Sequence, residues 1–338
     1  MKSKLATIFL MLVLLIMVFV RTDYAAPRQQ ISVGGLEPGG SGYPFQVAMT
    51  QVINESLPEV NVTLLSGSGA VDLLTRLSRG QVHFAPTDTA NSWDLYHGTG
   101  KFEGKGFTKF RGFLTQEQIY MAFVVTRDSG ITSLEQLEGK PYFPGYSGST
   151  AQLDLKMAFE KFGIKPNYFS GTLQDGQDAL QNRRIIGMSK YSPAAGDAFW
   201  DSIYATLPLR HLSLSEAQIN IYLALKKGLV AKVVVPPGVN RGQDKPIVSW
   251  GMSRSIAVSQ DLSEDLVYAM FKAIHRDWIK GTKGKIGAST PALANVEPAK
   301  LTAETADAMG IWLHPGVIKY LRELKYQIPE GAIPPEMK

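Results

Sequence analysis

The sequence predicts an α/β fold in which two lobes, each a mixed or parallel sheet flanked by helices, enclose a central cleft. Strand, loop and helix patterns alternate in two separate series, at residues 31–85 and 119–201, and such alternation is typical of parallel sheets with helices on their faces. The chain of 338 residues is also long for one hydrophobic core. We expect one lobe to comprise residues 28–125 and 250–338, and the other residues 126–249.

The first series fills most of the first hundred residues. Short apolar or alternating runs predict strands, and longer runs with an apolar face predict helices. In chain order these are a strand at 31–33, a helix at 43–55, a strand at 60–65, a helix at 70–79 and a strand at 82–85. Two loops rich in glycine and serine, 34–42 and 66–69, each follow a strand and precede a helix.

The second series begins at an apolar strand, 119–125, after which the chain is expected to cross into the other lobe near Thr126. Its elements are a short helix at 134–137, a strand at 141–143, a loop at 145–150, a helix at 151–162, a strand at 185–189 and a helix at 192–201. A return crossing is expected between 236 and 250, before helices at 262–278 and 315–326. Two crossings make a hinge and a cleft.

The N-terminus predicts export. Lys2 and Lys4 precede an apolar run from Leu5 to Val20, and residues 21–26 are small or polar. This layout is typical of a secretory signal peptide, here residues 1–26. A retained membrane anchor is the alternative, since the apolar run approaches the length of a membrane span. We expect a periplasmic protein.

Composition and charge exclude several classes. Cysteine is absent, which excludes disulfides, thiol catalysis and iron–sulfur ligation. The formal net charge is +5, and it falls to +3 without residues 1–27, which carry three basic residues and one acidic residue. A charge this small argues against binding to nucleic acid.

Motifs for catalysis, metal or cofactor binding are not found. None of the five histidines stands at metal-ligand spacing from another, and the sequence contains no zinc-protease, nucleophile-elbow or phosphate-loop motif. We therefore expect no catalytic residue, no metal and no cofactor, and a structural role for His314 in the turn before Pro315. An enzyme whose catalytic residues are distant in sequence stays open as an alternative.

Small solutes bind outside the carboxyl ends of parallel strands, beside helix N-termini. The loops in that position supply the expected ligand-binding residues: Gly39, Gly40, Ser41, Tyr43, Ser66, Ser68, Asp88, Thr89, Gly148, Ser149 and Thr150. Several have a second interpretation. Ser149 and Thr150 also suit the N-terminal cap of a helix, and Tyr43 also suits a core aromatic.

Asp88 has three interpretations, because a carboxylate in a poorly hydrated cleft is costly unless it is paired. It could cap a helix over residues 89–96, pair with Arg76, or accept a hydrogen bond from the ammonium group of an amino-acid ligand.

Five stretches, in this order, carry a family resemblance: Pro38–Pro44, Tyr96–Phe102, Leu134–Lys140, Gly145–Thr150 and Leu313–Glu323. The last, Leu-His-Pro-Gly-Val-Ile-Lys-Tyr-Leu-Arg-Glu, is the most specific. Together they resemble the TAXI family, the solute receptors of one class of tripartite ATP-independent periplasmic (TRAP) transporters. The sequence departs from the family pattern at Gly42, His83, Asp88 and Ala90.

The resemblance implies a two-lobed periplasmic binding protein of type II-like fold that closes on its ligand like a Venus flytrap. It implies a non-enzymatic receptor that delivers a small organic anion or amino acid, glutamate-like or another carboxylate, to the membrane subunits of a TRAP permease. The departures bear on which ligand is bound. A receptor for another permease or for a sensor, on the same two-lobed scaffold, is the alternative.

Overall fold

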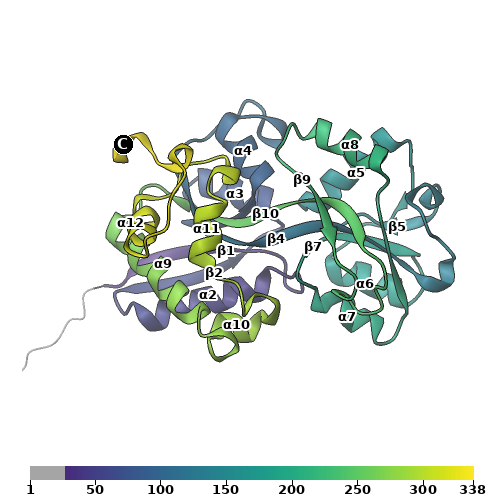
Figure 1. The fold of residues 1–338 in the computed structure, drawn as a ribbon, viewed down its shortest axis with the longest axis horizontal. Coiled ribbons are helices and arrows are strands. Elements are labelled where there is room, and N and C mark those ends of the chain that lie inside the picture. Colours follow the sequence, from purple (N-terminus) through teal and green to yellow (C-terminus); the bar gives the residue numbers. More distant parts are fainter. Residues whose placement is uncertain (1–26) are drawn as a thin grey trace, which may run out of the picture.

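In the computed structural model, which describes residues 27–338, two α/β lobes lie side by side and share one mixed sheet (Figure 1). The expected signal peptide, and with it the alternative of a retained anchor, lies outside the described residues. Within residues 27–338, no helix is both long enough and apolar enough to cross a membrane.

The sheet has ten strands, and eight of them follow the order β2-β1-β3-β10-β4-β7-β5-β6. β8 pairs with β4, and β9 pairs with β10. The strands are β1 (Gln29–Gly35), β2 (Val60–Ser66), β3 (Phe84–Asp88), β4 (Phe110–Thr126), β5 (Pro141–Phe143), β6 (Asn167–Tyr168), β7 (Gly187–Pro193), β8 (Leu209–Leu212), β9 (Ala231–Val235) and β10 (Ile247–Ser259). β1 is parallel to β2 and β3, and β5 is parallel to β6 and β7.

Helices cover both faces of the sheet in each lobe (Figure 1). They are α2 (Tyr43–Ser56), α3 (Ala70–Ser78), α4 (Thr89–His97), α5 (Thr150–Phe162), α6 (Leu173–Gln181), α7 (Ala198–Tyr204), α8 (Glu216–Leu225), α9 (Glu264–Trp278), α10 (Lys285–Ser289), α11 (Pro298–Glu304) and α12 (Pro315–Glu323). Short 3-10 helices include η1 (Gly100–Phe102), η3 (Leu134–Leu137) and η5 (Pro291–Leu293). The sequence prediction is confirmed to within two residues at both ends for α2, α3, α5 and α9.

The long strands β4 and β10 run antiparallel through both lobes. Phe110 and Leu114 of β4 pack in the core of the first lobe, whereas Ile119 and Phe123 pack in a core of the second. The chain therefore passes between lobes inside β4, several residues before the expected crossing near Thr126. Register shifts before Ser255 and after Ile256 mark a bulged region of β10 at the same level, and bulges bend a strand locally.

The helix expected at 192–201 is wrong in its first half. Ser192 and Pro193 end β7, and α7 begins only at Ala198. The reason is tertiary, because residues 187–193 pair antiparallel with β4, and this long-range ladder overrides the local helical pattern.

The structural role expected for His314 is confirmed. Its buried imidazole caps α12, where Nδ1 accepts a hydrogen bond from the Gly316 N–H (3.2 Å) and Nε2 lies 3.1 Å from the Leu262 carbonyl oxygen. The cap needs an unprotonated Nδ1, so the ring holds α12 against the loop before α9 in its neutral form.

The stability that His314 contributes is expected to fall on acidification from pH 6.5 to about 4. Burial lowers the pKa of His314 from 6.5 to about 4, since the imidazolium ion would lose its hydration. The unfolded chain takes up the proton first, so unfolding is favoured as the pH falls through this window. The difference corresponds to roughly 3 kcal/mol. Urea unfolding at pH 7 and pH 4.5 measures it.

His314→Asn is the matched control, because asparagine caps a helix without titrating in this range. Buried His211, whose pKa is also lowered to about 4, remains in both proteins. An identical loss of stability in wild type and variant would contradict the assignment to His314.

Candidate ligand-binding site

A small cavity of about 80 Å³ lies between the lobes, and we call it the inner cavity. The first lobe lines it with the loop after β1, the end of β3 and the start of α3. The second lobe contributes the loop after β5, the start of α6 and part of β7, and the crossing strands add Ile119 and Arg254. The inner cavity thus lies at the carboxyl ends of parallel strands from both lobes, where α/β folds bind ligands.

The structure brings some of the predicted ligand-binding residues together and leaves others apart. Gly40, Ser41, Asp88, Ser149 and Thr150 line the inner cavity. The remaining predicted residues do not: Ser66, Ser68 and Gly148 are exposed, Thr89 is buried, Tyr43 is half-buried, and Gly39 lines a neighbouring cavity instead. From this stretch of the chain only Ala70, at the start of α3, lines the inner cavity.

The N-terminus of α5 faces the inner cavity. The Ser149 hydroxyl accepts a hydrogen bond from the Gln152 N–H (3.1 Å), which confirms the capping role. Gly148 precedes it with φ +79°, a left-handed conformation that glycine adopts without strain, and its N–H donates to Gln152 Oε1 (3.0 Å). The loop therefore aims a helix N-terminus, with its partial positive charge, at the space between the lobes.

Asp88 caps α4, which confirms one of its three interpretations. Oδ1 accepts from the Asn91 N–H (2.9 Å), and Oδ2 accepts from the Asn91 side-chain amide. Burial raises the pKa of Asp88, opposed by the Asn91 hydrogen bonds and by Lys101. Pairing with Arg76 is wrong, because Arg76 binds Asp72 (3.1 Å) on its own helix.

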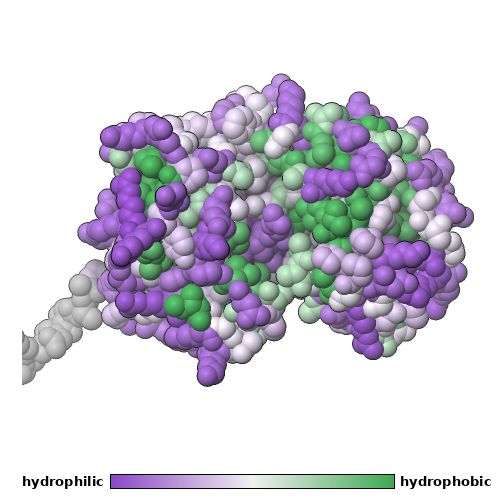
Figure 2. All heavy atoms as spheres, in the orientation of Figure 1, coloured by the Kyte–Doolittle hydropathy of each residue, from purple (hydrophilic) through white to green (hydrophobic). Residues whose placement is uncertain are grey.

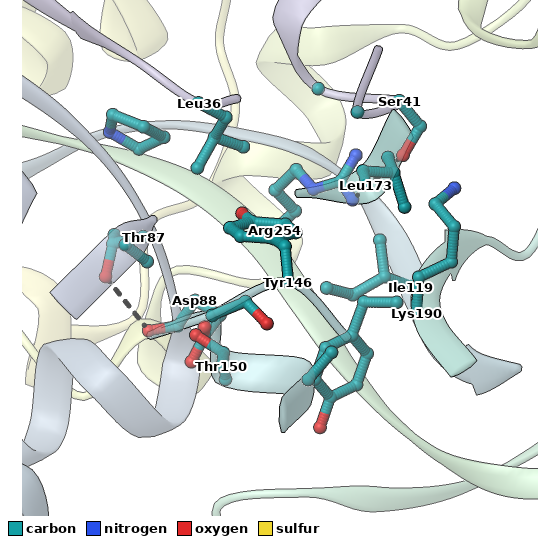
Figure 3. A pocket seen from close by; sticks show the side chains of 17 residues that line it. Leu36, Ser41, Thr87, Asp88, Ile119, Tyr146, Thr150, Leu173, Lys190 and Arg254 are labelled. Carbon is teal, nitrogen blue, oxygen red and sulfur yellow. Dashed lines mark hydrogen bonds between the residues drawn. The ribbon is translucent and has the colours of Figure 1, made fainter. Parts of the chain in front are cut away.

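Two cations that sequence reasoning missed also line the inner cavity. Lys190 of β7 pairs with Asp197, and Arg254 of β10 pairs with Glu117 and donates to Ser41 Oγ (3.2 Å). All four charged residues are at least 94% buried. The sequence does contain a sign of their importance, because Lys190 and Arg254 are each the only charged residue of their strand. Figure 3 shows Lys190 and Ser41 on one side of the cavity, across from Asp88 and Thr150.

Burial dominates the electrostatics of these pairs. It lowers the pKa of Lys190, opposed by Asp197, and it raises the pKa of Glu117, opposed by Arg254. Each cation therefore has its own carboxylate partner in a place from which water is largely excluded.

Contacts across the cleft hold the lobes together. The Asn91 amide donates to Thr150 Oγ1 (2.9 Å), and the Leu173 N–H donates to Glu37 Oε1 (3.1 Å). Lys101 of the first lobe lies 3.6 Å from Asp154 of the second. Residues on the two sides of the cleft are therefore joined by direct contacts.

Asp154 is the centre of a buried charge cluster. Oδ1 accepts from Lys226 Nζ (2.7 Å), and Oδ2 accepts from the Tyr191 hydroxyl (2.8 Å). Burial alone would raise the pKa of Asp154, but Lys101 and Lys226 outweigh it and hold the pKa below its ordinary value. The cluster thus contains one carboxylate and two ammonium groups, of which only Lys101 comes from the first lobe.

A larger cavity of about 560 Å³, which we call the outer cavity, adjoins the inner one and shares Gly40 and Ser41 with it. It is lined by α7 and the loop before it, by η5, and by Glu117 and Asp197. Figure 2 shows the surface hollowed between the lobes on the side of α7 and α10. Within residues 27–338, no group of three or more His, Asp or Glu side chains is placed to hold a metal ion.

Solved structures of similar fold include the periplasmic binding protein BugD, with 12% sequence identity, 88% of this chain and 97% of that chain covered, and a TM-score of 0.54. The alkanesulfonate-binding protein SsuA from Xanthomonas axonopodis pv. citri, bound to MOPS, is 14% identical over 90% of this chain and 86% of that chain, with a TM-score of 0.49. A putative L-cystine ABC transporter from Listeria monocytogenes is 17% identical over 79% of this chain and 97% of that chain, with a TM-score of 0.48.

At these identities the likeness concerns the fold alone, and the fold is the two-lobed α/β architecture of periplasmic binding proteins. The match to a protein family is more specific, because it covers residues 34–324 and so includes both lobes and both crossing strands. This chain belongs to the NMT1-like family.

Proposed function

We propose that this protein is an exported, periplasmic solute-binding receptor that captures a small organic anion or amino acid between its lobes and releases it to a membrane permease without chemical change. The observation that carries the proposal is the inner cavity, which is lined by both lobes and faced by Lys190, Arg254 and the N-terminus of α5.

A carboxylate suits this cavity on physical grounds. Two buried cations and a helix N-terminus provide positive potential, and hydrogen bonds from ionised donors to a carboxylate are among the stronger ones in proteins. Ser149 and Thr150 add polar side chains at the same helix terminus.

The permease that this receptor serves is, in our proposal, of the TRAP type. The TAXI-like stretches, above all the one that contains His314, favour a TRAP-type permease. Within that stretch, the buried His314 side chain caps α12. Uptake by vesicles that contain a TRAP permease, with and without the purified receptor, tests this assignment. Uptake that depends on the receptor only with an ATP-driven permease would replace it.

Calorimetric titration with small monocarboxylates, dicarboxylates and amino acids tests the binding function itself. We expect at least one to bind with a Kd in the micromolar range or below, and mass spectrometry to recover it unchanged after incubation. Chemical conversion of the bound molecule would favour an enzyme on the same scaffold.

We propose that the lobes move as units about β4 and β10, so that an open form admits the ligand. Solution X-ray scattering should then show a smaller radius of gyration on saturation with ligand. The same scattering curve with and without bound ligand would contradict the proposed closure.

Ser149→Asp is expected to weaken carboxylate binding at least tenfold while the protein stays folded. Aspartate caps a helix as well as serine does, but it places a negative charge at the buried N-terminus of α5 beside the ligand. Ser149→Asn is the matched control, since it caps without charge. Equal carboxylate affinity of the Asp and Asn variants in calorimetry would rule out a carboxylate site at this helix.

A further inference from the structure

Two buried ion pairs separate the inner from the outer cavity, and both have the same orientation. The cations Lys190 and Arg254 line the inner cavity, and their partners Asp197 and Glu117 line the outer one. Asp88 also lines the inner cavity, where it caps α4, but the members of these two ion pairs are ordered, with the cations on the inner side and the carboxylates on the outer side.

One of the two carboxylate oxygens of Glu117 accepts no hydrogen bond among the described residues. Its hydrogen bonds from Arg254 and from the Gln116 amide (3.0 Å) both end on Oε1. Oε2 accepts no hydrogen bond among residues 27–338, and Glu117 lines the outer cavity although the residue is only 6% exposed. Asp197 differs, because its two oxygens accept from Lys190 and from the Phe199 N–H.

The lining of the outer cavity disfavours a second carboxylate on the ligand. No Lys, Arg or His side chain lines it, and its third carboxylate, Asp201, adds negative charge. A ligand carboxylate placed there would lose water without gaining a cation, which is costly. A ligand ammonium group would instead find Glu117 Oε2 and the ring of Phe199, and both kinds of contact stabilise a cation.

We propose that Glu117 determines ligand specificity, and that the ligand is a carboxylate with a protonated amine at its other end. The carboxylate lies in the inner cavity with Lys190 and Arg254, and the ammonium group lies in the outer cavity and donates to Glu117 Oε2. This inference rests on the proposed solute-binding function and narrows its ligand class from organic anions and amino acids to acids that carry an amine at the end of the chain opposite the carboxylate.

Calorimetric titration of the mature protein with matched straight-chain acids tests the inference. For chains of four, five and six carbons, each ω-amino acid is compared with the monocarboxylate that lacks the amine and with the dicarboxylate. We expect the best amino acid to bind at least tenfold more tightly than its monocarboxylate, and the dicarboxylate to bind most weakly of the three.

Glu117→Gln should reduce the ratio of the two affinities, amino acid to monocarboxylate, at least tenfold. Asp201→Asn is the matched control, since it removes a charge from the same cavity without touching Glu117, and it should reduce the ratio less than threefold. If both variants reduce the affinity ratio equally, the preference for the amine comes from the overall negative charge of the cavity, and the proposed role of Glu117 is wrong.

The titration of the wild-type protein with the matched acids tests the inference even if Glu117→Gln fails to fold. If carboxylates bind but the amine brings no advantage, the inference is wrong and the proposed function survives. If none of these acids binds, the inference is wrong, and the proposed function is wrong as well if the wider titration with small acids and amino acids also finds no ligand. A dicarboxylate that binds more tightly than the amino acid of equal length overturns the inference as well.

Discussion

Arg254→Met is expected to abolish measurable carboxylate binding and to destabilise the fold. The arginine lines the inner cavity, so its loss should weaken binding at least 100-fold, or about 2.7 kcal/mol. It also leaves Glu117 buried without its cation, and breaking a buried ion pair in this way costs about 3–5 kcal/mol of unfolding free energy. Calorimetry measures the first effect and urea unfolding the second.

The double variant Arg254→Met/Glu117→Met separates the two effects. Replacing both members of a buried pair with apolar residues is often neutral for stability, so the double variant should regain most of the unfolding free energy. It should not regain carboxylate binding, because the cation is still missing. Tight carboxylate binding by the folded double variant would remove Arg254 from the site.

Asp154→Asn is expected to have the second large effect, a loss of about 3–5 kcal/mol of unfolding free energy. The substitution leaves Lys226 buried without a carboxylate and leaves Lys101 without its partner across the cleft. Urea unfolding measures the loss. A change below about 1 kcal/mol would mean that the cluster is not held together by charge.

Lys101→Met isolates the part of this cluster that crosses the cleft. Lys226 and Tyr191 keep their bonds to Asp154, so the second lobe should stay intact. The closed arrangement loses one ion pair that the open one lacks, so we expect a larger radius of gyration in scattering and a few-fold weaker ligand binding. Unchanged scattering and affinity would show that the contact plays no part in closure.

Local signals in the sequence were sufficient for much of the secondary structure near the site. The amphipathic pattern of α5 and the serine before it predict both the helix and its cap, and Asp88 before α4 does the same. These predictions depend on residues three or four positions apart, whose interactions the helix itself fixes.

Strand ends were less predictable, because pairing with distant strands determines where a strand stops. β4 extends over 17 residues, although only its second half reads as a strand, since β10 pairs along the first half as well. β7 continues through Pro193 for the same reason.

The sequence alone determined the two series of strands and helices, the loops at the carboxyl ends of the strands and the helix caps that face the cleft. Only the tertiary structure decided which side chains meet there. Glu117 and Arg254 are 137 positions apart and become partners because the β4–β10 ladder sets them opposite each other. Cross-strand register is a long-range property, and a shift of β10 by one residue would turn Arg254 to the face of the sheet opposite Glu117.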